Sequence, residues 1–376
     1  DPRLIVTIPA AVAGAAMDSG VARKPIIDMA GYRHNLRSRL DPTADSLTLI
    51  LEKVKSRPQR VVFAEGEEER AIRAAIAFRN AGYGTPILIG REDRIRETVK
   101  TAGLGNIADL EIRNASLSTK SNDKYVDFLY RRLQRKGAML RDCQRMVNQD
   151  RNTYGACMVA TGDADAMVTG LTRSFMVCYD EITRVIDPVK NSRVFGLSIL
   201  VGRGRTVFVA DTTVQETPEA EHLVDIAIQT AAKARQMGQE PRVAFLSFAS
   251  FGLYKKPMLE RIQKAVALMD QRGVDFEYDG EMTADVALDY ELMKRLYPFS
   301  RLSGPANVLV MPGLHAANIS TKMMQKLGGV TLVGPLLIGL DKPAQVVQMG
   351  ASANDLVTAA ALAAHDALHV KDSAYW

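Results

Sequence analysis

Residues 304–322, GPANVLVMPGLHAANISTK, carry the clearest local signal in the sequence. The apolar run 307–312 predicts a buried strand, Pro312-Gly313 predicts a turn, and a helix led by Asn318 is expected to follow. Small residues in the turn allow close approach of the backbone to a ligand, and a helix N-terminus offers free N–H groups to a phosphate or carboxylate. Lys322 lies one turn into the expected helix and adds charge. The pattern alone favours the simpler interpretation, a strand-to-helix connection capped by Asn318.

The same alternation of short apolar runs and helical stretches begins at about Ser46. We expect strands over 60–64, 86–90, 165–170, 206–211, 242–247, 307–312 and 330–333, and helices over 68–81, 218–237, 256–271, 318–327 and 353–369. This pattern predicts an α/β protein with mainly parallel sheets. Ligands of such sheets bind beyond the carboxyl ends of the strands. Four expected strands end in polar or glycine-bearing turns, at 170–174, 211–213, 247–250 and 312–315, so a site is expected where these turns converge.

Residues 1–40 have a different character. An Ala-rich stretch predicts a helix over 8–17 that starts at Pro9, and Asp28 is expected to cap a second helix through Arg39. Residues 41–43 read as a linker. The stretch has too little apolar material for a domain, and the chain begins with Asp1 rather than Met, so we expect a tail that belongs to an upstream domain.

Composition excludes several functional classes. The chain has 376 residues, 47% of them hydrophobic, and a formal net charge of +5 without any block of like charge, which argues against nucleic acid as a partner. No apolar run is long enough for a membrane span, and no signal pattern opens the chain. Cys143, Cys157 and Cys178 form no CxxC pair, so we expect reduced, buried thiols in a cytoplasmic protein.

Three weaker motifs favour structural interpretations. Gly202 and Gly204 precede a strand, which is typical of a hairpin rather than of a dinucleotide loop. Asp285 and Asp289 have the spacing of a metal pair, but a solvated helix face is the favoured interpretation. His365 and His369 lack a nearby carboxylate third ligand, so zinc is not expected. We therefore predict no metal and no cofactor in this chain.

Several further motifs occur in a fixed order along the chain. They are VVFAEG at 61–66, VFVAD at 207–211, VAFLSF at 243–248, DGE at 279–281, the stretch 304–322 and GPLLIGLDKP at 334–343. Together they resemble the phosphate acetyltransferases and butyryltransferases over roughly residues 50–376.

The resemblance implies a two-lobed α/β fold of the isocitrate/isopropylmalate-dehydrogenase type with a cleft between the lobes. Lobe I would comprise residues 46–190 and 341–376, and lobe II residues 191–340. It also implies dimers. The candidate acyl-CoA-binding residues are Thr172, Arg173, Ser247, His315, Asn318, Lys322 and Asp355.

The departures from this family concern its catalytic positions. Active members carry Ser and Arg where this chain has Gln348 and Met349, and a phosphate-handling Arg where it has Asp180. A guanidinium binds phosphate in bidentate fashion and stabilises an oxyanion, whereas a thioether does neither. Loss of one such stabiliser typically costs about 10²–10³ in rate. Arg173 and Arg184 are the residues that could compensate.

Residues 170–173 and 141–147, together with the stretch 1–26, resemble one branch of this family, the module fused behind bacterial NADP-dependent malic enzymes. Residues 1–45 would then be the tail of the malic-enzyme nucleotide-binding domain and a linker. This implies a regulatory acetyl-CoA-binding and oligomerisation domain, itself inactive, of an enzyme that converts malate to pyruvate and CO2. NADP and Mg or Mn would bind upstream, and the assembly would be a dimer or a hexamer built from dimers. An active phosphate acetyltransferase and a purely structural assembly module are the alternatives.

Overall fold

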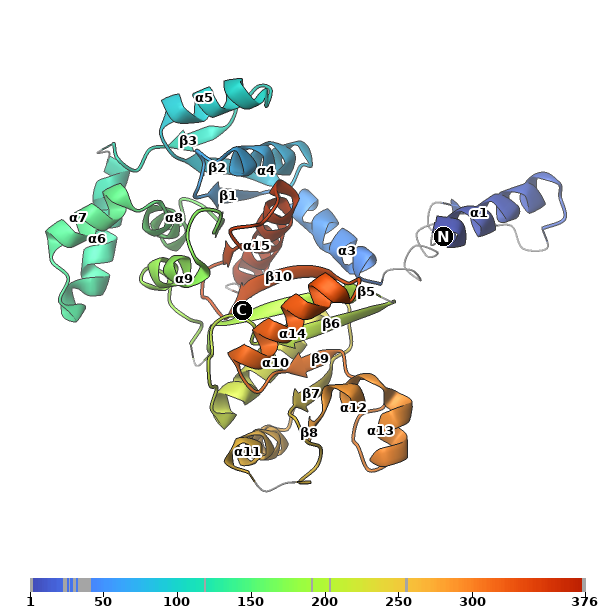
Figure 1. Cartoon of the computed structure of the whole chain (residues 1–376). Coiled ribbons are helices and arrows are strands. Elements are labelled where there is room, and N and C mark those ends of the chain that lie inside the picture. Colours follow the sequence, from blue (N-terminus) through green and yellow to red (C-terminus); the bar gives the residue numbers. More distant parts are fainter. Residues whose placement is uncertain are drawn as a thin grey trace.

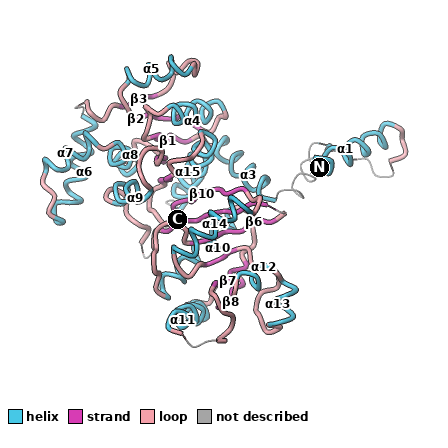
Figure 2. Tube along the Cα trace, in the orientation of Figure 1, coloured by secondary structure: helices cyan, strands magenta, loops and turns pink. Residues whose placement is uncertain are grey.

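The computed structural model describes residues 3–22, 26, 28, 29, 32, 42–117, 120–190, 192–202, 204–253 and 256–373. Two β-sheets dominate it, each with helices packed against it (Figure 1). The strands appear as two separate magenta groups in Figure 2. The expected α/β class with mainly parallel strands is confirmed.

The first sheet has five strands in the order β11-β4-β1-β2-β3, and all neighbours are parallel. The strands are β1 (Gln59–Phe63), β2 (Gly84–Ile89), β3 (Glu111–Arg113), β4 (Ala166–Thr169) and β11 (Ala344–Val346). Every residue of β4 and β11 is buried, which explains why these strands read as continuous apolar runs.

The second sheet has six strands in the order β10-β5-β6-β9-β7-β8. They are β5 (Phe195–Gly202), β6 (Arg205–Ala210), β7 (Arg242–Leu246), β8 (Glu277–Met282), β9 (Val308–Val310) and β10 (Thr331–Ile338). Strands β6, β9, β7 and β8 pair in parallel, whereas β10-β5 and β5-β6 are antiparallel. Gly202 pairs with Arg205, so the hairpin expected at this position is confirmed.

Fifteen bounded helical elements are described around the two sheets. They are α1 (Arg3–Asp18), α3 (Pro42–Ser56), α4 (Glu69–Asn80), α5 (Glu92–Ala102), α6 (Lys120–Leu133), η1 (Gln134–Lys136), α7 (Leu140–Gln149), α8 (Arg151–Ala160), α9 (Phe175–Thr183), α10 (Ala220–Gln236), α11 (Pro257–Arg272), α12 (Ala284–Leu288), α13 (Tyr290–Leu296), α14 (Leu314–Leu327) and α15 (Ala353–Ser373). Pro257 opens α11, where its missing N–H costs no helical hydrogen bond, and the left-handed Gly273 closes it.

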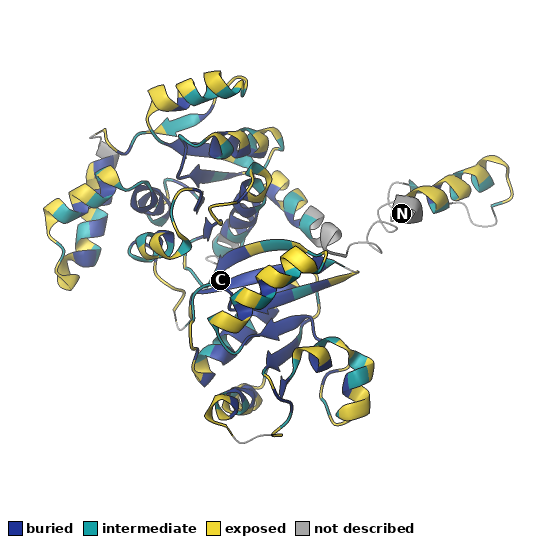
Figure 3. Ribbon diagram, viewed as in Figure 1, coloured by how far each residue is buried: buried dark blue, intermediate teal, exposed yellow. Residues whose placement is uncertain are grey.

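Each sheet is covered on both faces. One face of the first sheet packs against α4 and α15, and the other against α6, α7, α8 and α9. One face of the second sheet packs against α10 and α11, and the other against α12, α13 and α14. The strands therefore lie in the dark blue interior of Figure 3, with exposed residues on the outer helix faces.

Three local expectations were wrong. Helix α14 begins at Leu314 rather than at Asn318, because the good helix formers Ala316 and Ala317 already complete its first turn. Residues 42–43 open α3 instead of forming a linker. Pro9 lies inside α1, since a proline removes one helical hydrogen bond without always ending the helix. The helix expected over 28–39 falls mostly outside the described residues.

Helix α15 joins the two sheets. It packs on the first sheet through alanines, while its Leu362 belongs to the apolar core of the second. Near its end, Asp366 forms an ion pair with the buried Lys233 of α10. The side-chain amide of the buried Gln345 in β11 forms two hydrogen bonds with the main chain of Leu337 in β10. Its Oε1 accepts from the Leu337 N–H, and its Nε2 donates to the Leu337 carbonyl. The strands of the first sheet come from residues 59–169 and 344–346, and those of the second sheet come from residues 195–338. The boundaries of the two lobes stay a prediction.

Gly170, which follows β4, is expected to tolerate no side chain. Its φ is +121°, and an added Cβ would lie 2.1 Å from the carbonyl oxygen of Val347. Gly162 is a matched control, since its φ is +81° but its Cβ would meet open space. We expect Gly170→Ala to lower the free energy of unfolding by about 3 kcal/mol or more and Gly162→Ala by about 1 kcal/mol. Equal losses in urea denaturation would contradict the close approach.

Stability should fall in acid because of His369. Burial lowers the pKa of His369 below its ordinary 6.5, and the nearby His365 and Lys53 lower it further. The unfolded chain therefore takes up this proton at a higher pH than the folded chain, so stability is lost as pH falls through 6.5. Between about pH 7.5 and about pH 5.5 we expect the wild type to lose more free energy of unfolding than His369→Asn. Parallel losses in the two proteins would refute the assignment.

Candidate functional site

A pocket of about 710 Å³ lies between α14, β10 and the segment that leads from β11 into α15. It brings together two of the candidate ligand residues, Lys322 and Asp355, with Gln348, one of the positions that depart from the family. Residues far apart in sequence therefore meet where the two sheets adjoin. The remaining candidates lie elsewhere.

The pocket combines an apolar floor with a polar rim. Leu336, Val347 and Leu362 are buried beneath it. The exposed side chains of Lys322 and Lys326 stand on one rim, on α14, and Asp355 stands across from them on α15. A cavity of this size that combines an apolar floor with convergent polar groups is typical of a small-molecule site.

One wall of the pocket is the loop 347–352. The Val347 N–H donates to the Thr169 carbonyl at 2.8 Å, which ties the loop to β4. On the other side Arg70 donates through Nη1 to the carbonyl oxygens of Met349 at 2.9 Å and Ala351 at 2.7 Å. The loop is therefore held at its first residue and near its end.

Asp355 caps the helix that follows this loop. Its Oδ2 accepts hydrogen bonds from the N–H and the hydroxyl of Ser352, each at 2.8 Å. The Ser352 hydroxyl oxygen accepts in return from the Asp355 N–H at 3.2 Å. This reciprocal arrangement is a capping box. Asp355, the one acid among the candidate ligand residues, thus has a structural role as well as a place in the pocket.

The positions that depart from the family carry no cation. Gln348 and Met349 are exposed in the loop, Met349 by 55%. Asp180 is exposed on α9 and does not line the pocket. These three positions therefore place no guanidinium at the pocket.

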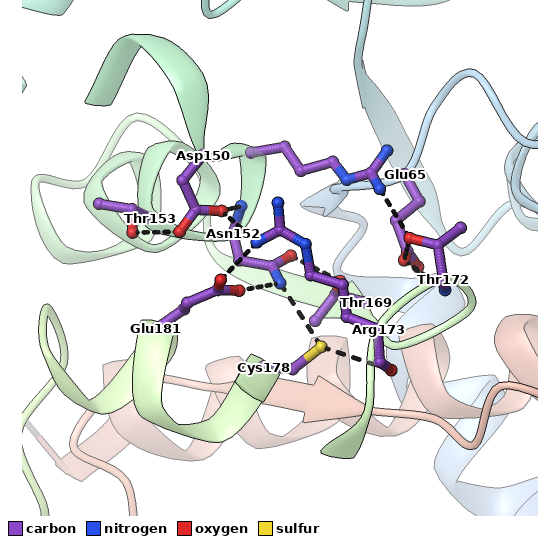
Figure 4. Close-up of polar contacts among 10 residues, drawn as sticks. Glu65, Asp150, Asn152, Thr153, Thr169, Thr172, Arg173, Cys178 and Glu181 are labelled. Atoms are coloured by element: carbon purple, nitrogen blue, oxygen red, sulfur yellow. Dashed lines mark hydrogen bonds and ion pairs between the residues drawn. The ribbon is translucent and has the colours of Figure 1, made fainter. Parts of the chain in front are cut away.

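Thr172 is held by a buried carboxylate (Figure 4). Glu65, which is 2% exposed, follows β1 and accepts hydrogen bonds from the N–H groups of Gly170, Leu171 and Thr172 at 2.6–2.9 Å. It also accepts from the Thr172 hydroxyl at 2.6 Å. Sequence reasoning missed this role of Glu65, although an acid directly after a predicted strand was a signal for it.

Arg173 is neutralised by two acids. Its Nη1 donates to Asp150 at 3.0 Å and to Glu181, and both carboxylates are at most 15% exposed (Figure 4). Asn152 donates to Glu181 at 2.7 Å and accepts from the Thr169 hydroxyl at 2.6 Å. Burial raises the pKa of Glu181, while the bonds from Asn152 and Arg173 oppose that rise. Arg173, one of the two arginines that could compensate for the acid at Asp180, is thus already paired.

The other candidates are dispersed. The Ser247 hydroxyl is buried after β7 without a hydrogen-bond partner among the described residues. Asn318 donates to the Thr212 carbonyl at 3.3 Å. His315 is exposed in a separate pocket of about 450 Å³ beside Arg261. The four strand-end turns therefore do not line one pocket.

The described residues also bear on metal binding and on membrane insertion. No group of three His, Cys, Asp or Glu side chains within it is placed to hold a metal ion. The Asp289 carboxylate accepts a hydrogen bond from the Leu292 N–H at 3.0 Å and so caps the start of α13, which is a structural role. Among the same residues, no helix is long and apolar enough to cross a membrane.

Comparison with known proteins gives relatives of two kinds. The NADP-dependent malic enzyme of Rhizobium meliloti is 54% identical over 98% of this chain and 48% of its own length. That of Escherichia coli is 36% identical over 98% of this chain and 49% of its own length. The chain thus spans about half the length of the malic enzymes it matches.

The second kind of relative is the phosphotransacetylases. The solved EutD phosphotransacetylase from Staphylococcus aureus superposes with a TM-score of 0.79 at 28% identity, covering 86% of this chain and 99% of its own. A phosphotransacetylase from Streptococcus pyogenes gives 0.81 at 28% identity, with 87% and 99% covered. Residues 46–364 match the family model of phosphate acetyl/butaryl transferase. The chain therefore belongs to the phosphate acetyl/butaryl transferase family.

Proposed function

We propose that this chain is the regulatory and assembly part of an NADP-dependent malic enzyme, that it binds acetyl-CoA, and that it does not transfer the acetyl group. The parent enzyme would convert malate to pyruvate and CO2 in the cytoplasm, with NADP and Mg or Mn bound by another part of the protein. The identity to malic enzymes over 98% of the chain supports this placement. This chain would assemble the parent enzyme into homo-oligomers built from dimers.

The observation that carries the loss of transfer is the loop at Gln348 and Met349. Transfer of an acetyl group to phosphate requires cations that bind the phosphate and stabilise the developing oxyanion. Here an amide and a thioether occupy the loop, and Arg70 beneath it donates to main-chain carbonyls. Arg173 is paired with Asp150 and Glu181, so it is not available for a substrate phosphate.

The 710 Å³ pocket suits an acyl-CoA in size and in charge. CoA carries phosphates on one part and an apolar thioester arm on another. The ammonium groups of Lys322 and Lys326 would meet the phosphates, and the floor formed by Leu336, Val347 and Leu362 would meet the arm. Acetyl-CoA binding would regulate the parent enzyme only if it distinguished two states of it, and the coupling would be reciprocal.

Transferase activity is the first test. We expect the chain to form no acetyl phosphate from acetyl-CoA and phosphate above the uncatalysed rate, measured by release of the free CoA thiol. The solved phosphotransacetylase of Staphylococcus aureus, assayed in parallel, is the positive control. Turnover within about tenfold of that enzyme would show that Gln348 and Met349 do not abolish transfer, because loss of even one oxyanion stabiliser costs more than that.

A lysine substitution tests the pocket. We expect Lys322→Met to weaken acetyl-CoA binding about fivefold, since a partly exposed charge contact is worth up to about 1 kcal/mol. The difference from wild type should shrink at high salt. Lys264→Met is the matched control, because Lys264 of α11 forms an ion pair with Glu221 of α10, outside the pocket. Equal affinities for wild type and Lys322→Met in calorimetry would place the phosphates elsewhere.

A further inference from the structure

Arg70 binds the pocket loop from behind. It lies in the first turn of α4, and its Nη1 spans 279 and 281 residues of sequence to reach the carbonyl oxygens of Met349 and Ala351. A cation in the first turn of a helix is unfavourable to the helix dipole. The two hydrogen bonds to the loop therefore explain why a guanidinium occupies this position. Stabilisation of α4 does not explain it.

The two ends of the loop are fixed, since Val347 and Ala351 are buried and the Val347 N–H bonds to the Thr169 carbonyl, but its middle has fewer contacts. Within it, the Ala351 N–H donates to the Gln348 carbonyl at 2.9 Å. Gln348, Met349 and Gly350 are all exposed. Three exposed residues in a row, one of them glycine, sample many conformations unless a contact from outside fixes them. The Arg70 guanidinium supplies that hold, through charge-assisted hydrogen bonds to two carbonyls on the same loop.

The hold also orients the loop peptides. In a trans peptide the N–H points opposite to the C=O. With the Met349 carbonyl directed at Arg70, the Gly350 N–H is directed away from Arg70. Gly350 lines the pocket, and Arg70 does not. The Gly350 N–H is therefore a candidate main-chain donor to a ligand in the pocket, beside the uncharged side chains of Gln348 and Met349.

We infer that Arg70 is a positioning residue for the acyl-CoA pocket. It fixes residues 348–351 so that the Gly350 N–H serves an anionic or carbonyl group of the ligand. The identity of this ligand rests on the proposed function. The clamp itself rests on the two hydrogen bonds to the loop.

The test compares Arg70→Met and Arg70→Lys with Arg73→Met in the 376-residue chain. Arg73 lies on the same helix and pairs only on the surface with Glu69, so it controls for loss of a charge from α4. Acetyl-CoA affinity is measured by calorimetry, and amide hydrogen exchange is measured for residues 347–352 without ligand. We expect Arg70→Met to weaken binding at least about tenfold, because hydrogen bonds from a charged donor are worth about that much.

Loop amides should exchange faster in Arg70→Met, while those of β1 and β4 stay protected. Arg70→Lys should restore part of both properties, and Arg73→Met should match the wild type. Wild-type binding and wild-type loop exchange in Arg70→Met would overturn the inference. If the wild type itself binds no acetyl-CoA, the proposed function fails. The clamp is then judged by exchange alone, and unchanged loop exchange would overturn it as well.

Discussion

The close packing of one alanine-rich helix between two sheets is the constraint on which the rest of the structure depends. Ala360, Ala363 and Ala364 of α15 are fully buried, and their small side chains let the helix lie directly on the first sheet. Leu362 turns the other way, into the core of the second sheet. This helix therefore contributes to both cores, together with the Gln345–Leu337 hydrogen bonds between β11 and β10. The start of the same helix, at Asp355, forms a wall of the pocket.

The loops at the strand ends keep their shape through buried carboxylates rather than through ligands. Glu65 after β1 and Asp211 after β6 each accept several main-chain N–H bonds from loops that follow a strand. For Asp211, burial raises the pKa and these bonds oppose the rise. Such a scaffold persists without any substrate. The fold is therefore held by residues other than Gln348 and Met349, which are both exposed.

Periodicity and turn signals predicted the α/β class, most strands and the helix at the C-terminal end, because each buried strand is a short apolar run of distinctive length. They placed the start of α14 wrongly, since an Asn cap and an Asn in a second turn look alike in sequence. The site was harder to predict. Lys322 and Asp355 meet in one pocket, but the pairing of Arg173 with Asp150 and Glu181 depends on how α8 and α9 pack. The contact of Arg70 with the loop could not be predicted from the sequence, because Arg70 binds main-chain carbonyls, which every residue carries.

Binding of acetyl-CoA in the pocket beside α14 is the property on which the proposed function depends. The most direct measurement is a calorimetric titration of the 376-residue chain with acetyl-CoA in the absence of phosphate. We expect saturable binding at one site per chain, with the acetyl thioester intact when the ligand is recovered. Absence of binding would contradict it and would leave assembly as the surviving role of the chain.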